Sequence, residues 1–162
     1  MTNKYMYFIA NWKMYGDLNS LKSLDIVTKF SKHLNKKTKI IYCPPFTLLS
    51  KFVDKFKNTR ISIGGQNCHQ NDSFGPHTGS INSKMLKNIG AKYVILGHSE
   101  NRSEGENDFL INKKLKTSES SSLNIIFCFG ETLLEKKKNL TKKIINKQIQ
   151  NSLKGIKNKH KI

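Results

Sequence analysis

Two side chains that could act on an anionic carbonyl compound stand directly after apolar runs of the sequence. Lys13 follows the run 5–10, and His98 follows the run 92–96. An ammonium group stabilises negative charge on a substrate. An imidazole that opens a helical turn lies near positive partial charge, which favours its neutral form, and neutral imidazole can polarise a carbonyl group. Either residue alone is typical of a solvated loop, whereas both at one edge of a sheet favour a catalytic site.

The hydrophobic pattern predicts a parallel sheet that would bring these residues together. Short apolar runs alternate with segments whose apolar residues recur every three or four positions, which predicts strands alternating with helices. We expect strands at 5–10, 39–43, 61–64, 92–96 and 124–129, and helices at 18–34, 46–56, 81–89, 109–115 and 140–156. Continuous apolar runs are typical of strands buried on both faces of a parallel sheet. In such folds functional residues gather where strands end, which is where Lys13 and His98 stand.

The length of the repeating unit favours a closed barrel over an open doubly wound sheet. Successive strands begin about 34, 22, 31 and 32 residues apart, and a (β/α)8 barrel averages about 31 residues per unit. Five units use nearly all of the 162 residues, and residues 160–162 are interpreted as the start of a sixth strand. We therefore predict a single α/β domain over residues 1–162, a (β/α)8 barrel that is incomplete here. Its first and fifth strands would have exposed edges, which promote aggregation.

The composition excludes several functions. The formal net charge is +18, but of 29 basic residues only Arg60 and Arg102 are arginine. Nucleic-acid sites favour arginine and stacking aromatic residues, so we interpret the lysines as solvated surface and expect no nucleic-acid partner. No apolar run is long enough to span a membrane, and residues 1–10 lack the features of a secretory signal. Cys43, Cys68 and Cys128 are odd in number and widely spaced, which argues against disulfides and a metal site and fits the cytoplasm.

Four blocks of the sequence resemble triosephosphate isomerase. They are residues 8–14 (FIANWKM), 75–81 (GPHTGSI), 94–102 (VILGHSENR) and 128–132 (CFGET). The blocks occur in the family's order and at about its spacing, and the match extends from about residue 5 to the end of the sequence. The resemblance implies a (β/α)8 barrel that interconverts dihydroxyacetone phosphate and glyceraldehyde 3-phosphate in glycolysis and gluconeogenesis. It also implies a cytoplasmic enzyme that uses no metal and no organic cofactor.

The same resemblance implies a role for each matched residue. His98 would be the electrophile that hydrogen-bonds to the substrate carbonyl and the enediolate. Lys13 would supply positive charge to the enediolate and the phosphate, and Asn11 would orient the substrate beside it. Glu100 would hold Lys13 in place. Thr78, at the tip of the long third loop, would reach into a partner subunit and form an obligate homodimer.

Two positions depart from the family pattern. The family usually has glutamate at the position of Ser80 and arginine at the position of Asn101, and these two charges pair across the subunit boundary. Because both are replaced together, no uncompensated charge is left, and the exchange can be nearly neutral. Glu106 matches a buried structural acid of the family.

The resemblance also implies a general base, but none of the 162 residues corresponds to it. In the family this base is a glutamate just after the sixth strand. A general base contributes about 10²–10⁴-fold to the rate, so we expect the 162-residue polypeptide to be a family member with no meaningful isomerase turnover. Three alternatives remain: another enzyme on the same barrel, a nucleic-acid-binding protein, and a non-catalytic or structural fragment of a barrel protein.

Overall fold

The computed structural model describes residues 5–158 and 162, and its strands form one curled parallel sheet. The strands are β1 (Met6–Asn11), β2 (Thr38–Cys43), β3 (Ile61–Gly65), β4 (Tyr93–Leu96) and β5 (Asn124–Phe127). They lie in sequence order, and each pairs in parallel with the next. This order is that of a (β/α)8 barrel and differs from a doubly wound sheet, in which the strand order reverses. The predicted fold, five units of such a barrel, is confirmed.

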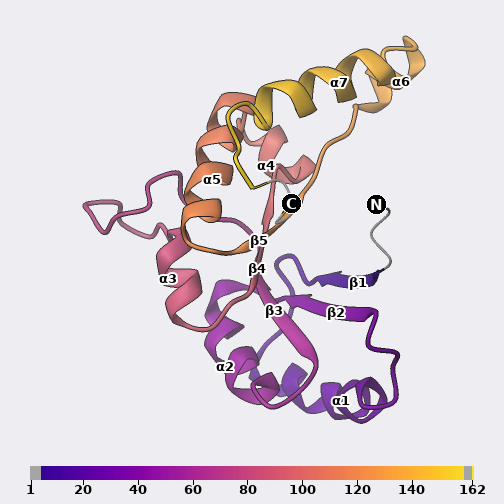
Figure 1. The fold of residues 1–162 in the computed structure, drawn as a ribbon, viewed down its shortest axis with the longest axis vertical. Helices are drawn as coiled ribbons and strands as arrows, with labels where there is room; N and C mark the ends of the chain where they lie inside the picture. Colours follow the sequence, from indigo (N-terminus) through magenta and orange to yellow (C-terminus); the bar gives the residue numbers. More distant parts are fainter. Residues whose placement is uncertain (1–4, 159–161) are drawn as a thin grey trace.

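The connections between the strands are helical and cover the outer side of the curled sheet (Figure 1). They are the 3-10 helix η1 (Leu18–Leu24) and α1 (Asp25–Ser31), α2 (Phe46–Phe56), α3 (Ser83–Asn88), and α4 (Ser99–Ser103) and α5 (Asp108–Ser120). After β5 the chain continues into α6 (Leu133–Lys137) and α7 (Thr141–Ser152). Three segments hold two helices where a single helix was expected. A capping box between Asp17 and Ser20 starts η1 ahead of α1, the short helix α4 precedes α5, and Asn139, at a φ of 55°, separates α6 from α7.

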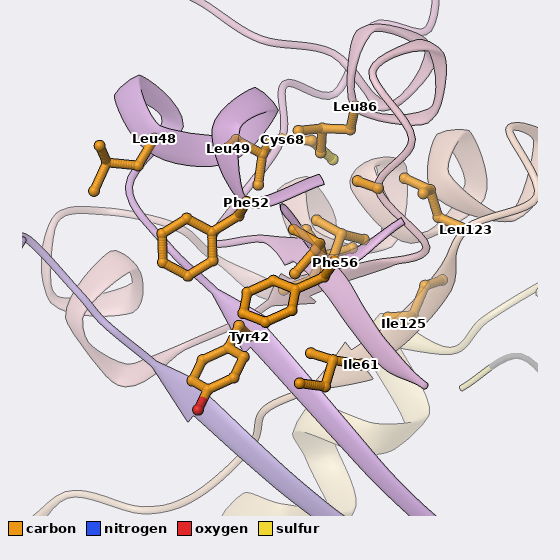
Figure 2. Close-up of a cluster of buried hydrophobic side chains, with 14 of the residues drawn as sticks. Tyr42, Leu48, Leu49, Phe52, Phe56, Ile61, Cys68, Leu86, Leu123 and Ile125 are labelled. Carbon is orange, nitrogen blue, oxygen red and sulfur yellow. The ribbon is translucent and has the colours of Figure 1, made fainter. Parts of the chain in front are cut away.

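Helix α2 anchors the hydrophobic core because its apolar residues recur along one face (Figure 2). Phe52 is fully buried, and the ring of Phe56 stacks on that of Tyr42 from β2 at 5.8 Å. The indole of Trp12, which follows β1, meets the Phe52 ring edge-on at 4.9 Å. Each such buried aromatic side chain contributes about 1.5–3 kcal/mol to folding. The core therefore reaches the residue that precedes Lys13.

Strand β1 is not buried on both faces, contrary to the expectation. Met6 is 61% exposed and Phe8 55% exposed, and their neighbours Tyr7 and Ile9 are each 42% exposed. The physical reason is position, because β1 ends the strand order and pairs with β2 alone among the described strands. The expected start of a sixth strand, at 160–162, falls largely outside the described residues. In the part of the chain that is described, no helix has the length and apolarity to cross a membrane.

Candidate active site

The carboxyl end of β1 holds Lys13 in an unusual backbone conformation. Lys13 has a φ of 52°, in the left-handed region that few residues other than glycine adopt. The Oδ1 atom of Asn11 accepts a hydrogen bond from the Lys13 amide at 3.0 Å. The side-chain amide of Gln66, just after β3, donates to the Lys13 carbonyl at 2.8 Å and to the Cys43 carbonyl at 2.9 Å. Gln66 thus joins the ends of three strands and stabilises this strained turn.

His98 is positioned by the turn that ends β4. Gly97 has a φ of 75°, and a Cβ atom at this position would lie 2.7 Å from the Cys128 carbonyl oxygen. The turn makes His98 the N-cap of α4, where its Nδ1 atom accepts a hydrogen bond from the Glu100 amide at 3.3 Å. A neutral His98 therefore carries its proton on Nε2. That nitrogen is the one available to donate to a substrate oxygen.

Glu100 connects the lysine to the histidine turn. Its Oε1 atom lies 2.7 Å from Lys13 Nζ, and its Oε2 atom lies 3.5 Å from His98 Nδ1. The hydrogen bond and charge of Glu100 raise the pKa of Lys13, and the hydrogen bond to Lys13 lowers the pKa of Glu100. Both groups are consequently ionised at neutral pH, although each is about half exposed.

A cavity of about 700 Å³ lies between these groups. Its lining includes Asn11, Lys13, His98 and Glu100, the four residues singled out in the sequence for this edge of the sheet. The lining presents an ammonium group and an imidazole to this cavity. Thr78 is placed elsewhere, exposed in the loop between β3 and α3. Asn101 lines the same cavity, whereas Ser80 lines two smaller ones.

A second cavity, of about 600 Å³, adjoins His98 on the side of β5. It is lined in part by residues 128–132, the last of the matched blocks. The Gly130 amide donates to Gln148 Oε1 of α7 at 2.9 Å, and the Gly130 carbonyl accepts from Gln148 Nε2 at 2.9 Å. Glu131 accepts a hydrogen bond from Thr141 at 3.0 Å. Helix α7 therefore holds the block beside the histidine turn.

Arg102 supports the histidine turn from behind. Its Nε atom donates to the Gly97 carbonyl at 2.9 Å, and its Nη1 atom lies 2.8 Å from Asp108 of α5. The sequence alone assigns no structural role to Arg102 or to Gln66. Arg102 is the last residue of the block 94–102, and its place in that block is a sequence signal for a structural role. Gln66 offers no comparable signal, because a polar residue after a strand is typical of any loop.

A buried ion pair lies beneath the loop between β3 and α3. Lys114 of α5 pairs with Glu106, and the Glu106 carboxylate also accepts from Asn67 Nδ2 at 2.8 Å. The two charged side chains are 7% and 10% exposed. The second carboxylate oxygen of Glu106 is buried without a hydrogen-bond partner. Among the described residues, no three His, Cys, Asp or Glu side chains converge on a possible metal position.

Known proteins that are similar to this chain identify its family. The family model for triosephosphate isomerase matches residues 6–162. Triosephosphate isomerase from Bartonella bacilliformis is 40% identical over 156 residues, which are 94% of this chain and 61% of the relative. The enzyme from Alkaliphilus oremlandii is 38% identical over 149 residues, 91% of this chain and 59% of the relative.

The crystal structure of triosephosphate isomerase from Bartonella henselae superposes with a TM-score of 0.85 at 36% identity. The superposition covers 93% of this chain and 62% of that one. The chain thus spans about three-fifths of the length of the relatives that it matches. The match runs through every strand and through all four sequence blocks, three of which line the two cavities. The chain belongs to the triosephosphate isomerase family.

Proposed function

We propose that the protein interconverts dihydroxyacetone phosphate and glyceraldehyde 3-phosphate, and that the described residues supply the electrophilic part of its active site. The observation that carries the proposal is the cavity that Lys13 and His98 share. The reaction moves a proton from C1 to C2 of the substrate through an enediolate. Negative charge develops on the carbonyl oxygen as the first proton leaves, so groups that stabilise this oxygen accelerate the step.

His98 donates from Nε2 to the carbonyl oxygen. Its Nδ1 atom is occupied by the Glu100 amide, which fixes the neutral tautomer that can donate at the other nitrogen. Lys13 places its ammonium group beside the enediolate and the phosphate, and Asn11 orients the substrate next to it. Glu100 is a positioning residue, since it reaches the substrate through Lys13.

The general base lies outside this set of residues. Among the carboxylates that line the two cavities, Glu100 pairs with Lys13, Glu131 accepts from Thr141, and Glu135 accepts from Thr132. Glu104 also lines the larger cavity, but it follows the fourth strand and not a sixth. The family resemblance assigns the base to a glutamate after a sixth strand. We therefore expect the 162-residue polypeptide on its own to bind the substrate without turning it over.

We also propose an oligomeric state, a cofactor requirement and a cellular location for the enzyme. A homodimer would form through the loop that carries Thr78, which would approach Asn11 and His98 of the partner subunit. The reaction is a pair of proton transfers and needs neither a metal nor an organic cofactor. The place of the protein in glycolysis and gluconeogenesis, in the cytoplasm, follows from the same family membership.

The test is a titration of the 162-residue chain with dihydroxyacetone phosphate, followed by amide NMR. We expect shifts at residues 11–13 and 97–100, with binding weakened about tenfold in Lys13→Met because a charge-assisted contact to the phosphate is lost. Lys22→Met, at an exposed lysine of η1, is the matched control and should bind like the parent. Shifts confined to other residues would refute the site. Isomerase turnover by the 162-residue chain would refute the assignment of the base.

A further inference from the structure

The loop between β3 and α3 carries two histidines whose rings face each other. The ring centroids of His69 and His77 are 4.5 Å apart, and the ring planes are inclined by 34°. His69 is partly buried and His77 is exposed. Two positive charges at this separation repel each other, so both rings cannot be protonated at low cost. The stack is compatible with neutral rings.

Asn71 joins the two rings and determines which nitrogens are free of protons. Its backbone amide donates to His69 Nδ1 at 3.2 Å, and its side-chain Nδ2 atom lies 2.7 Å from His77 Nε2. Both contacted ring nitrogens are acceptors in this arrangement. A proton on His69 Nδ1 would have no acceptor at this contact, because the backbone N–H of Asn71 has no lone pair to offer.

The surroundings of His69 oppose its protonation. Partial burial, the adjacent His77 and the Lys114 ammonium of α5 together lower the pKa of His69 from its ordinary value of 6.5. Lys114 is itself paired with Glu106. Asp72 is the one acidic residue between positions 66 and 80, and it is not among the groups that shift the pKa of His69. The charged groups acting on the ring therefore favour its neutral form.

Two further hydrogen bonds hold the base of the loop. The His69 amide donates to the Ile81 carbonyl at 2.7 Å, and the Asn82 side chain donates to the Ser73 carbonyl at 3.0 Å. His69 thus contributes both its backbone and its ring to the loop conformation. Loss of the ring contacts would leave the loop attached to its surroundings through these two bonds, at positions 69 and 73.

We propose that His69, Asn71 and His77 form an acid-sensitive latch, which holds the loop 66–80 folded at neutral pH and releases it in acid. A histidine whose pKa is lower in the folded loop than in the open loop stabilises the folded form above pH 6.5, and this contribution is lost as the pH falls. One such group changes the opening equilibrium by up to about tenfold between pH 7.5 and pH 5.5.

Hydrogen–deuterium exchange of the 162-residue chain at these two pH values tests the latch. After correction for the intrinsic exchange rate, we expect peptides from 66–80 to lose protection at pH 5.5 while peptides from β2 and β4 do not. His69→Asn keeps an acceptor near the Nδ1 position and cannot take a proton, so its loop should keep its protection. His33→Asn, at an exposed histidine outside the loop, is the matched control and should respond like the parent.

A second variant covers the case in which His69→Asn fails to fold. His77→Phe keeps a ring against His69 but removes the like charge, so the pKa of His69 should rise toward 6.5 and the loss of protection should become smaller. Ring NMR signals of His69 in the parent and in this variant give both midpoints. Equal loss of protection in the parent and either variant, or a parent loop that is equally protected at both pH values, would overturn the proposal.

Discussion

Lys13 Nζ lies 2.7 Å from Glu100 Oε1, so an ion pair joins the end of the first strand to the helical turn after the fourth. The pair spans a cavity, and each partner is about half exposed to solvent. The ion pair fixes the position of the Lys13 ammonium group. The ammonium group is held over the cavity that His98 also lines, where it can serve a substrate.

The ion pair has a predictable pH range. The lowered pKa of Glu100 means that its contribution is present above the ordinary value of 4.5 and is lost as the pH falls through the folded value. The raised pKa of Lys13 means that its contribution is present below 10.5 and is lost as the pH rises through the folded value. In Glu100→Gln, the Lys13 midpoint should return toward 10.5 in an NMR titration of the lysine side chains. An unchanged midpoint would contradict the pairing.

Gly97→Ala should destabilise the protein and displace His98. A methyl group would meet the Cys128 carbonyl oxygen at 2.7 Å, and the φ of 75° is unfavourable for alanine. We expect a loss of about 3 kcal/mol in urea unfolding, of which about 1–2 kcal/mol is the backbone cost. Gly79→Ala is the matched control, because Gly79 has a φ of 79° and nothing within 4 Å of its added methyl group. Equal losses in the two variants would show that the contact with Cys128 contributes nothing.

Lys114→Met should be strongly destabilising because it leaves the Glu106 carboxylate buried without its cation. The two side chains are 7% and 10% exposed, so the expected loss is about 3–5 kcal/mol. The double variant Lys114→Met with Glu106→Leu should recover most of this loss, since no buried charge remains. Lys55→Met, which breaks a pair with the exposed Asp25, should leave the unfolding midpoint nearly unchanged. Additive losses in the double variant would contradict the pairing.

Phe52→Ala should remove the support under the lysine turn. Phe52 is fully buried and contacts the chain's single tryptophan, Trp12. The cavity left behind predicts a loss of about 3–5 kcal/mol. Trp12 fluorescence during urea unfolding reports both the stability and the environment of the turn. Phe109→Ala, at a side chain that is 68% exposed, should change stability by less than about 0.5 kcal/mol, and a similar loss in both variants would refute the role of Phe52.

The amino-acid sequence by itself determined the fold class and the edge of the sheet at which Lys13 and His98 lie. Strand and helix patterns depend on neighbours a few residues away, so the spacing of apolar residues located the five strands and the helices α1, α2, α3, α5 and α7, but not the short helices α4 and α6. Parallel strands then have their carboxyl ends on one side by geometry. The shared cavity of Asn11, Lys13, His98 and Glu100 is consistent with that reasoning.

The tertiary structure alone decided the contacts between residues distant in the chain. Gln66 is 53 positions from Lys13, yet it stabilises the strained lysine turn, and Asn67 is 39 positions from the Glu106 carboxylate to which it donates. The apolar run that contains Met6 and Phe8 predicts buried strand residues. Their exposure in the structure depends on which strands lie beside β1. Local periodicity carries no information about such partners, because long-range contacts depend on how the whole sheet curls and brings remote segments together.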